Sequence, residues 1–274
     1  MQDAIITFPL FGESFALDIP RFFTIFGFRI HFYGLMLGLG LVVATIYAMK
    51  RAPEFGFTSE NIFDFLIYAV PAAVIVSRLY YVAFNLDIYA REPLRIITGI
   101  RDGGLTIYGV VLGAVLGVRL CSRVKKLDFW SFVDLGAIGL LIGQAIGRWG
   151  NFINRELFGR PTDMPWRMGL TVGEHTTYVH PTFLYESLWN TLGLILLHTY
   201  SKKVGRTYKG QLFVFYLGWY GLGRTWVEAL RDPGQNMFLG PIPINMAIAV
   251  LCFVGAVVAN ILLTRRAGNK EEEA

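Results

Sequence analysis

Seven stretches of this chain are apolar, nearly free of charged side chains and about as long as a helix that crosses a membrane. They cover residues 31–49, 62–84, 104–121, 129–147, 183–200, 211–228 and 244–263. The hydrocarbon core of a bilayer is spanned by roughly 20 helical residues, and a helix satisfies its backbone hydrogen bonds within its own segment. The sequence therefore predicts an all-α polytopic membrane protein with seven transmembrane helices.

The composition agrees with this class and argues against others. Of the 274 residues, 54% are hydrophobic and 16% are charged, whereas about 25% of the residues in soluble domains are charged. The two cysteines, Cys121 and Cys252, lie in no C-x-x-C or histidine-rich setting, so they suggest neither a metal site nor a redox pair. We expect no metal and no cofactor.

The lysines indicate how the predicted helices are oriented. All seven follow the first, third, fifth or seventh apolar stretch, and lysine-rich loops stay on the cytoplasmic side of the membrane. The N-terminus is therefore expected outside and the C-terminus in the cytoplasm. Residues 1–274 would form one membrane-embedded domain, with an external interfacial segment at 1–30, a small external head segment at 147–182 and a cytoplasmic tail at 264–274. The net charge of +5 fits this orientation and the attraction of anionic membrane lipids, so it indicates no nucleic acid.

Several arginines lie within the predicted helices or on their outer side, against the trend of the lysines. A guanidinium binds phosphate through two parallel hydrogen bonds, so an external arginine cluster beside lipid suggests a site for a phospholipid headgroup. For Arg91, Arg95 and Arg101, neutralisation of nearby carboxylates is the favoured interpretation. For arginines inside the apolar stretches, such as Arg78, a functional role is expected.

Two predicted helices carry glycines at helical spacing. Such rows of small residues let two helix backbones approach closely, so we expect these helices to pack closely in the centre of the bundle. The rows are Gly109, Gly113 and Gly117 in the third helix and Gly139, Gly143 and Gly147 in the fourth.

A polar row marks the outer end of the fourth predicted helix. Arg148, Asn151 and Arg155 are spaced i, i+3 and i+7, so they share a face if the helix continues that far. An arginine that holds phosphate and an amide that bonds an ester or glycerol oxygen would suit a glycerophospholipid. The alternative is a capped helix end, in which Asn151 bonds loop carbonyls.

A second polar row lies in the sixth predicted helix. Tyr220, Arg224 and Glu228 are spaced i, i+4 and i+8 in an otherwise apolar segment. A buried Arg224–Glu228 pair could be purely structural, but an intramembrane ion pair beside a hydroxyl is also typical of an active site.

Two aromatic strings lie at the outer ends of other helices. HFYGLMLG contains Tyr33 and opens the first helix, and HPTFLYE contains Tyr185 and Glu186 and opens the fifth. Tyrosines at this depth ordinarily form the aromatic belt of a membrane protein. Their coincidence on one side favours a shared site.

The strings HFYGLMLG, GRWGNFINRELFGRP, HPTFLYE and YGLGRTWVE, at these separations, resemble the bacterial prolipoprotein diacylglyceryl transferase family. The resemblance runs from about Tyr33 to Asp232, and its most specific part is the string from Gly147 to Gly159. It implies a multi-pass enzyme of the bacterial inner membrane whose active site faces the outer leaflet. Such an enzyme moves the diacylglyceryl group of phosphatidylglycerol to the lipobox cysteine of a preprolipoprotein, forms a thioether and releases glycerol phosphate.

The resemblance also implies site residues. In many members a histidine follows the paired glycines of the third helix, whereas here Tyr108 occupies that position. This difference casts doubt on a histidine base more than on the activity. The implied catalytic residues are Arg148, Arg224, Tyr108 and Tyr33, and the implied phosphatidylglycerol-binding residues are Arg148, Asn151, Glu156, Gly159, Tyr220 and Arg224.

A phospholipid transporter or flippase with an external headgroup site is the alternative function. Such folds commonly contain inverted repeats or paired broken helices, and no motif of this sequence occurs twice. A seven-helix retinal protein would need a Schiff-base lysine in its last helix, and residues 244–263 contain no lysine.

Overall fold

The computed structural model describes residues 4–12, 15–99, 103–235 and 238–272. The chain forms two compact units. The first contains the residues up to Tyr47 together with those from Asp134 onward, and the second is Ala48–Val133. The predicted segments 1–30 and 264–274 extend beyond the described residues, and Arg101 lies outside them.

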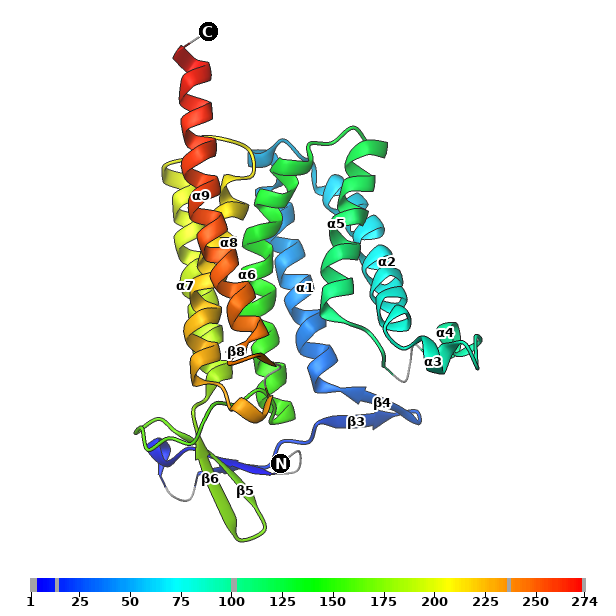
Figure 1. Ribbon diagram of the computed structural model, residues 1–274, viewed down its shortest axis with the longest axis vertical. Coiled ribbons are helices and arrows are strands. Elements are labelled where there is room, and N and C mark those ends of the chain that lie inside the picture. Colours follow the sequence, from blue (N-terminus) through cyan, green and yellow to red (C-terminus); the bar gives the residue numbers. More distant parts are fainter. Residues whose placement is uncertain (1–3, 13–14, 100–102, 236–237, 273–274) are drawn as a thin grey trace. The chain divides into compact units, whose positions relative to one another are not determined.

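Each of the seven predicted stretches forms a long helix, which confirms the helical part of the prediction (Figure 1). Five of these helices, α1, α2, α5, α6 and α9, are long and apolar enough to cross a membrane. The chain is therefore a multi-pass membrane protein. The helices are α1 Phe32–Arg51, α2 Ser59–Ala83, α5 Ile107–Val124, α6 Phe129–Asn154, α7 Thr182–Lys203, α8 Gln211–Leu230 and α9 Ile244–Glu272.

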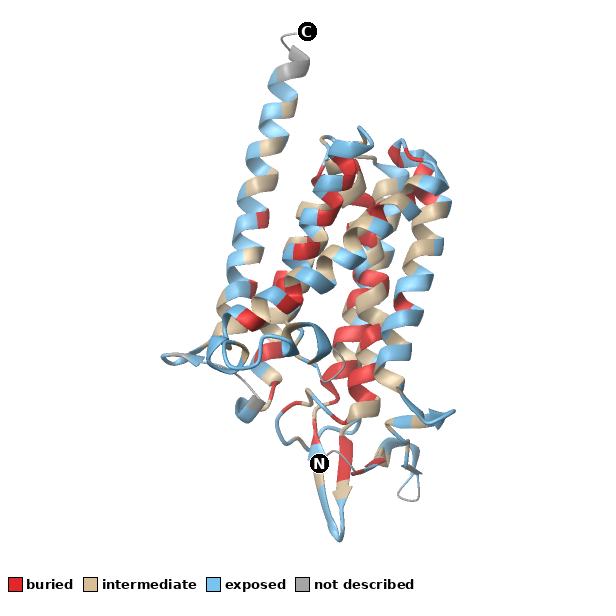
Figure 2. Ribbon diagram, turned by 90° about the vertical axis from the view of Figure 1, so that its right-hand side faces the viewer, coloured by how far each residue is buried: buried red, intermediate tan, exposed pale blue. Residues whose placement is uncertain are grey.

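The helices leave much apolar surface uncovered by protein. Exposed residues dominate α9, the helix that ends at the C-terminus (Figure 2). Leu251 in its middle is 71% exposed. In a water-soluble fold such a face would be an aggregation hazard, whereas in a bilayer the lipid chains cover it.

Helices α7 and α8 are long enough to span a bilayer but more polar than the other five. With 22 and 20 residues they extend roughly 30 Å, about the thickness of the hydrocarbon core. Their polar residues include Glu186 and Asn190 in α7, and Arg224 and Glu228 in α8. Seven membrane crossings stay a prediction, and these four residues come together in the site described below.

The prediction of an all-α fold is wrong in one respect, because the first unit contains a four-stranded antiparallel sheet. Its strands are β1 Ile5–Thr7, β2 Ala16–Leu17, β5 Met168–Val172 and β6 His175–Val179, in the order β2-β1-β5-β6. Ile6, Leu170 and Val179 form its buried core with Phe152 of α6 and Phe183 of α7. These contacts place the sheet at the end of α6 and the start of α7.

Arg155 anchors the N-terminal segment to this sheet. Helix α6 ends at Asn154, and Arg155 adopts a left-handed backbone conformation with φ of 51°. Its guanidinium donates to the carbonyls of Ala4, Ile19 and Ile153 at 2.9, 2.6 and 2.8 Å. The expectation that Arg155 shares a helix face with Arg148 and Asn151 is therefore wrong, because the helix stops one residue before it.

Short elements connect the helices. In the first unit they are the 3-10 helices η1 Pro9–Phe11 and η4 Pro233–Gln235, the hairpin of β3 Phe22–Ile25 and β4 Phe28–His31, and the hairpin of β7 Phe238–Leu239 and β8 Ile242–Pro243. In the second unit they are the 3-10 helix η2 Ala52–Phe55 and the short helices α3 Leu86–Tyr89 and α4 Arg95–Thr98.

The glycine row of α5 packs against α2 in the second unit (Figure 1). A Cβ at Gly113 or Gly117 would overlap the backbone of Ala72 or Tyr68. The expected close packing is therefore confirmed for α5, and its partner is α2. In the first unit, the row of α6 faces α1, where a Cβ on Gly40 would lie 3.2 Å from the Cα of Gly143.

Gly117→Ala should destabilise the α2–α5 pair by roughly 1–3 kcal/mol, since the added methyl group meets a backbone carbonyl that cannot move independently. Gly136→Ala in α6 is the matched control, because nothing lies within 4 Å of its Cβ position. The control should stabilise its helix by roughly 0.5–1 kcal/mol. Unfolding in mixed micelles of increasing SDS fraction measures both changes, and equal midpoints for the two variants would contradict the close contact.

Arg78 holds together the segment that precedes α5. Its guanidinium donates to the carbonyls of Arg95, Ile96 and Gly103 at 2.6, 2.9 and 3.0 Å. Gly104 has a φ of 77°, and a Cβ there would overlap the Arg78 guanidinium. The structure thus gives this arginine a scaffolding role, where the sequence had suggested a functional one.

Candidate active site

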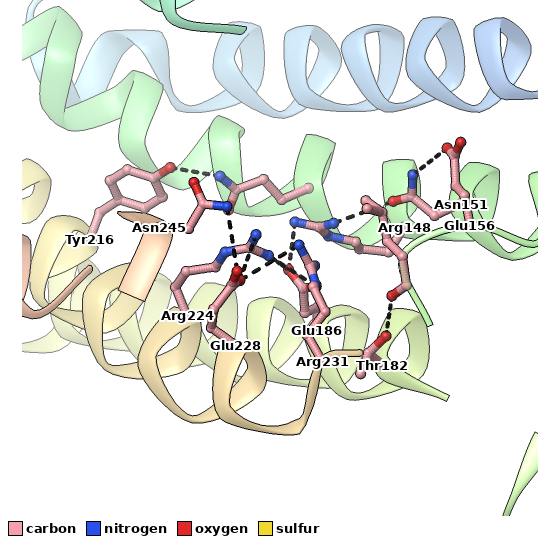
Figure 3. A network of polar contacts seen from close by, with 12 residues as sticks. Arg148, Asn151, Glu156, Thr182, Glu186, Tyr216, Arg224, Glu228, Arg231 and Asn245 are labelled. Atoms are coloured by element: carbon pink, nitrogen blue, oxygen red, sulfur yellow. Dashed lines mark hydrogen bonds and ion pairs between the residues drawn. The ribbon is translucent and has the colours of Figure 1, made fainter. Parts of the chain in front are cut away.

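The sheet-side ends of α6, α7 and α8 bring together a group of charged side chains (Figure 3). Arg148 comes from α6, Glu186 from α7, and Arg224 and Glu228 from α8, with Arg231 directly after α8. We call these five residues the arginine cluster. All of them belong to the first unit.

Glu186 lies at the centre of the cluster. Its carboxylate is 2.5 Å from Nη2 of Arg148, 3.3 Å from Nη1 of Arg224 and 3.2 Å from Nη2 of Arg231. One buried carboxylate thus orients three guanidiniums that would otherwise repel one another.

Glu228 lies in the last turn of α8 and also contacts the arginines of the cluster. Its Oε2 is 2.9 Å from Nη2 of Arg224 and 3.6 Å from Nη1 of Arg231, and its Oε1 accepts a hydrogen bond from Asn245 at 3.4 Å. The predicted Arg224–Glu228 pair is therefore confirmed. Within the arginine cluster, three guanidiniums thus face two carboxylates.

The three arginines differ in how much of each side chain remains accessible. Arg148 is 20% exposed and Arg224 is 11% exposed, whereas Arg231 is 3% exposed. Arg148 and Arg224 can therefore contact a ligand, while Arg231 is enclosed and holds Glu186 and Glu228 in place.

The signature string folds so that Glu156 reaches back to the cluster. Asn151 accepts a hydrogen bond from Nη1 of Arg148 at 3.3 Å and donates one to Oε1 of Glu156 at 2.8 Å. The turn is made by Arg155 and Leu157, both left-handed, and is closed by the amide of Glu156 donating to the Asn151 carbonyl at 3.1 Å. The structure thus brings Arg148, Asn151 and Glu156 together, and Asn151 does not serve as a cap for loop carbonyls.

Gly159 occupies a tightly packed position. A Cβ there would lie 2.6 Å from the Cβ of His180 and 2.7 Å from the carbonyl oxygen of Leu230. Its backbone forms an antiparallel bridge with Arg231. The residue therefore fits the segment after α6 closely against the end of α8, next to the cluster.

The two tyrosines predicted from the helices lie near the cluster. Tyr33 packs against Gly150, where a Cβ would lie 2.7 Å from its ring, and it is within electrostatic reach of Glu156 and Arg148. Tyr220 lies one turn before Arg224 and lines the same cavity.

Tyr108 belongs to the second unit, in the first turn of α5. Its side chain is 51% exposed, and its ring centroid is 6.5 Å from that of Tyr80. Tyr108 therefore belongs to the second unit, whereas the arginine cluster belongs to the first.

The HPTFLYE string fixes the loop between the sheet and α7. Tyr185 accepts a hydrogen bond from the indole of Trp166 at 2.7 Å, and its hydroxyl is 3.1 Å from Nδ1 of His180. Burial lowers the pKa of His180, because a charged imidazole is poorly solvated there. Tyr185 therefore holds this loop, while its neighbour Glu186 enters the cluster.

A cavity of about 290 Å³ opens between α6, α7 and α8 beside the arginines. The two accessible guanidiniums beside it are of the kind that binds phosphate or carboxylate oxygens through parallel hydrogen bonds. Its lining residues are Gln144, Arg148, Glu186, Trp189, Asn190, Tyr220, Gly223, Arg224 and Val227.

Sequence reasoning missed Gln144 and Asn190 of this cavity, and it noted Glu186 in the HPTFLYE string without giving it a role. A signal was present, because Glu186 and Asn190 are four residues apart in a largely apolar helix and so share one face. A carboxylate at such a position requires a cationic partner.

Comparisons with known proteins agree with the strings noted in the sequence. Residues 20–262 match the family described as prolipoprotein diacylglyceryl transferase. A phosphatidylglycerol–prolipoprotein diacylglyceryl transferase of Halalkalibacterium halodurans is 37% identical over 90% of this chain and 87% of its own length. Proteins of the same name from Clostridioides difficile and Bacillus cereus are 36% and 39% identical, over 92% and 86% of this chain and 98% and 87% of their own lengths. The chain belongs to the prolipoprotein diacylglyceryl transferase family.

Proposed function

We propose that the protein transfers the diacylglyceryl group of phosphatidylglycerol to the lipobox cysteine thiol of preprolipoproteins. The thiol gives up its proton to solvent or to the departing phosphate, the sulfur forms a thioether with the glyceryl carbon, the bond from that carbon to the phosphate oxygen breaks, and glycerol phosphate leaves. The proposal is supported by the family and by the names of the relatives at 36–39% identity. The observation that carries it is the arginine cluster beside a cavity among apolar helices.

The charge of the cluster suits this reaction. The phosphodiester of phosphatidylglycerol carries one negative charge, which the accessible guanidiniums of Arg148 and Arg224 attract. A second negative charge develops on the phosphate as the carbon–oxygen bond breaks. Preorganised guanidiniums in a poorly hydrated site stabilise that charge, and such stabilisation is commonly the largest catalytic contribution. Arg148 and Arg224 are the two arginines accessible for this role.

Asn151, Glu156 and Tyr220 complete the proposed lipid site, and Tyr33 is proposed to act beside them. Asn151 and Glu156 fix the position of the Arg148 guanidinium through a continuous chain of hydrogen bonds. Gly159 contributes by close packing beside Arg231. No step of this mechanism requires a metal or a cofactor.

Tyr108 is proposed to donate a hydrogen bond to the phosphate or to position the thiol. Tyr108→Phe should lower turnover by about tenfold or more, the scale of a hydrogen bond to a charged group. Tyr108→His should keep substantial activity. Tyr80→Phe is the control, and full activity of Tyr108→Phe would exclude both roles.

We further propose that the protein lies in the bacterial inner membrane with the cluster toward the outer leaflet. Cysteines introduced at two exposed positions test this orientation. A membrane-impermeant thiol reagent applied to protoplasts or spheroplasts should label Asp163→Cys and should not label Lys203→Cys. The reverse pattern would place the cluster on the cytoplasmic side.

The activity itself is tested with purified protein, labelled phosphatidylglycerol and a peptide that contains a lipobox cysteine. We expect a thioether-linked diacylglyceryl peptide and one glycerol phosphate for each peptide modified. A peptide with serine in place of cysteine is the control. Lipid that changes leaflets without forming a thioether would instead support a flippase.

A further inference from the structure

The polar residues of the cavity form two layers along the helices. Arg148, Glu186 and Arg224 form a charged layer. A neutral polar residue lies one helical turn from each of them, on the side away from the sheet. The pairs are Arg148 with Gln144 on α6, Glu186 with Asn190 on α7, and Arg224 with Tyr220 on α8. Four residues along a helix correspond to a rise of about 6 Å. The cavity therefore continues from a cationic part into an uncharged part.

The uncharged part contains hydrogen-bonding groups that the protein does not satisfy. Asn190 is 6% exposed, and its side-chain amide has no partner among the described residues. The side chain of Gln144 donates to the Tyr216 hydroxyl at 2.7 Å, while its Oε1 is buried and, within the described part of the chain, unpaired. A buried polar atom without a partner costs about 1–3 kcal/mol, which applies to Gln144 Oε1. The two amides are therefore suited to a ligand that supplies hydrogen bonds.

The chemistry of the cavity restricts that ligand. Six of its nine lining residues are polar or charged, namely Gln144, Arg148, Glu186, Asn190, Tyr220 and Arg224, which suits a small polar group and does not suit acyl chains. Hydroxyl groups can donate to Gln144 Oε1 and can also accept from the Asn190 amide. An ammonium headgroup would instead lie close to the guanidiniums of Arg148 and Arg224, which line the same cavity.

We propose that Gln144 and Asn190 bind the hydroxyl groups of the headgroup glycerol of phosphatidylglycerol while the arginines hold its phosphate. This inference rests on the proposed function. It makes the two amides responsible for the preference for phosphatidylglycerol over other lipid donors. The same two residues then hold the glycerol of the leaving glycerol phosphate until it departs. The acyl chains lie outside the cavity.

The first experiment compares two lipids of equal charge. Phosphatidylethanol has the phosphodiester of phosphatidylglycerol but no headgroup hydroxyl. The wild-type protein should use phosphatidylglycerol with a kcat/KM about 10–100-fold higher, because the analogue leaves buried amides unpaired. Gln144→Leu and Asn190→Leu should reduce this preference to about 3-fold or less by lowering only the value for phosphatidylglycerol.

Unchanged turnover of phosphatidylethanol in the variants shows that they are folded. Asn260→Leu is the matched control, since it removes an amide of α9 that accepts a hydrogen bond from the Tyr208 hydroxyl at 3.0 Å. The Asn260→Leu variant should keep the full preference for phosphatidylglycerol over phosphatidylethanol. A wild-type protein that uses both lipids equally, or leucine variants that lose both activities in parallel, would overturn the assignment.

The second experiment measures binding without turnover. Trp189 lines the cavity, so tryptophan fluorescence should respond when glycerol 1-phosphate enters. Glycerol 1-phosphate should bind the wild-type protein at least about tenfold more tightly than ethyl phosphate, and Gln144→Leu should remove the difference. Equal binding of the two phosphates to the wild-type protein would contradict this inference even if thioether forms. Preferential binding without thioether formation would instead contradict the proposed function alone.

Discussion

Arg148→Ala should lower the rate of thioether formation by about 10²–10³-fold, the effect of losing one preorganised group that stabilises developing charge. The variant should still fold. Glu186 keeps Arg224 and Arg231 as partners at 3.3 and 3.2 Å, so no carboxylate is left unpaired. Assays of purified protein at matched concentrations, with saturating phosphatidylglycerol and lipobox peptide, measure the change in kcat.

Two further variants separate charge from geometry at this position. Arg148→Lys should restore activity only in part, because an ammonium cannot form the two parallel hydrogen bonds of a guanidinium. Arg167→Ala is the control, since that guanidinium stacks on the Tyr178 ring at 4.6 Å, within the sheet region. Turnover of Arg148→Ala within about twofold of the Arg167→Ala value would show that phosphate is held elsewhere.

Glu186→Gln should have a large effect on both stability and activity. The neutral amide keeps the shape of the side chain but leaves the guanidiniums of Arg148, Arg224 and Arg231 without their shared counter-charge. Removing one partner of a buried ion pair destabilises a protein by about 3–5 kcal/mol. SDS unfolding in mixed micelles should show this loss, and the thioether assay should show little product.

A second substitution tests the electrostatic cause. Arg231→Met removes the most enclosed arginine, so Glu186→Gln with Arg231→Met should be more stable than the sum of the two single effects predicts. Glu174→Gln, at an exposed position between β5 and β6, is the control and should be neutral. Strict additivity of the two single effects would contradict the repulsion among the arginines.

The helices could be predicted from sequence because their signal is local. A run such as 244–263 is apolar over the length that a bilayer requires, and it forms most of α9. The glycine row of α5 was informative for the same reason, since its members lie on one face whatever helix they meet. That the partner is α2 depends on how the chain packs, which helical spacing does not specify.

The candidate site was predictable only where one helix carries the whole pattern. Arg148 with Asn151, and Arg224 with Glu228, are each neighbours on a single helix, and both pairs are in contact. Glu186 contacts residues 38 positions away on either side, so its role as the centre of three arginines needs the helices in place. A local pattern can show that such a carboxylate needs a partner but not which one.

The strands β1 and β2 were missed because they are short and because β1 also pairs with β5 over a long distance. The hairpin of β5 and β6 had a local signal, since two five-residue strands flank the turn at Gly173 and Glu174. β1 has three residues and β2 has two, too few for an alternating pattern to stand out. Arg155 was assigned to a helix face for a related reason. Its left-handed conformation is stabilised by carbonyls of Ala4 and Ile19, which lie far from it in the sequence.

The pairing of β1 with β5 has a consequence for the order in which the protein forms. Ile6 is opposite Leu17 of β2 on one side and Leu170 of β5 on the other, so β1 can pair early with β2, while the strand for its other edge is synthesised more than 160 residues later. Helices such as α1 need only their own residues, and local contacts form faster than distant ones. One edge of β1 therefore stays unpaired until β5 has been synthesised, and until then the backbone groups along that edge are open to a chaperone or to another chain.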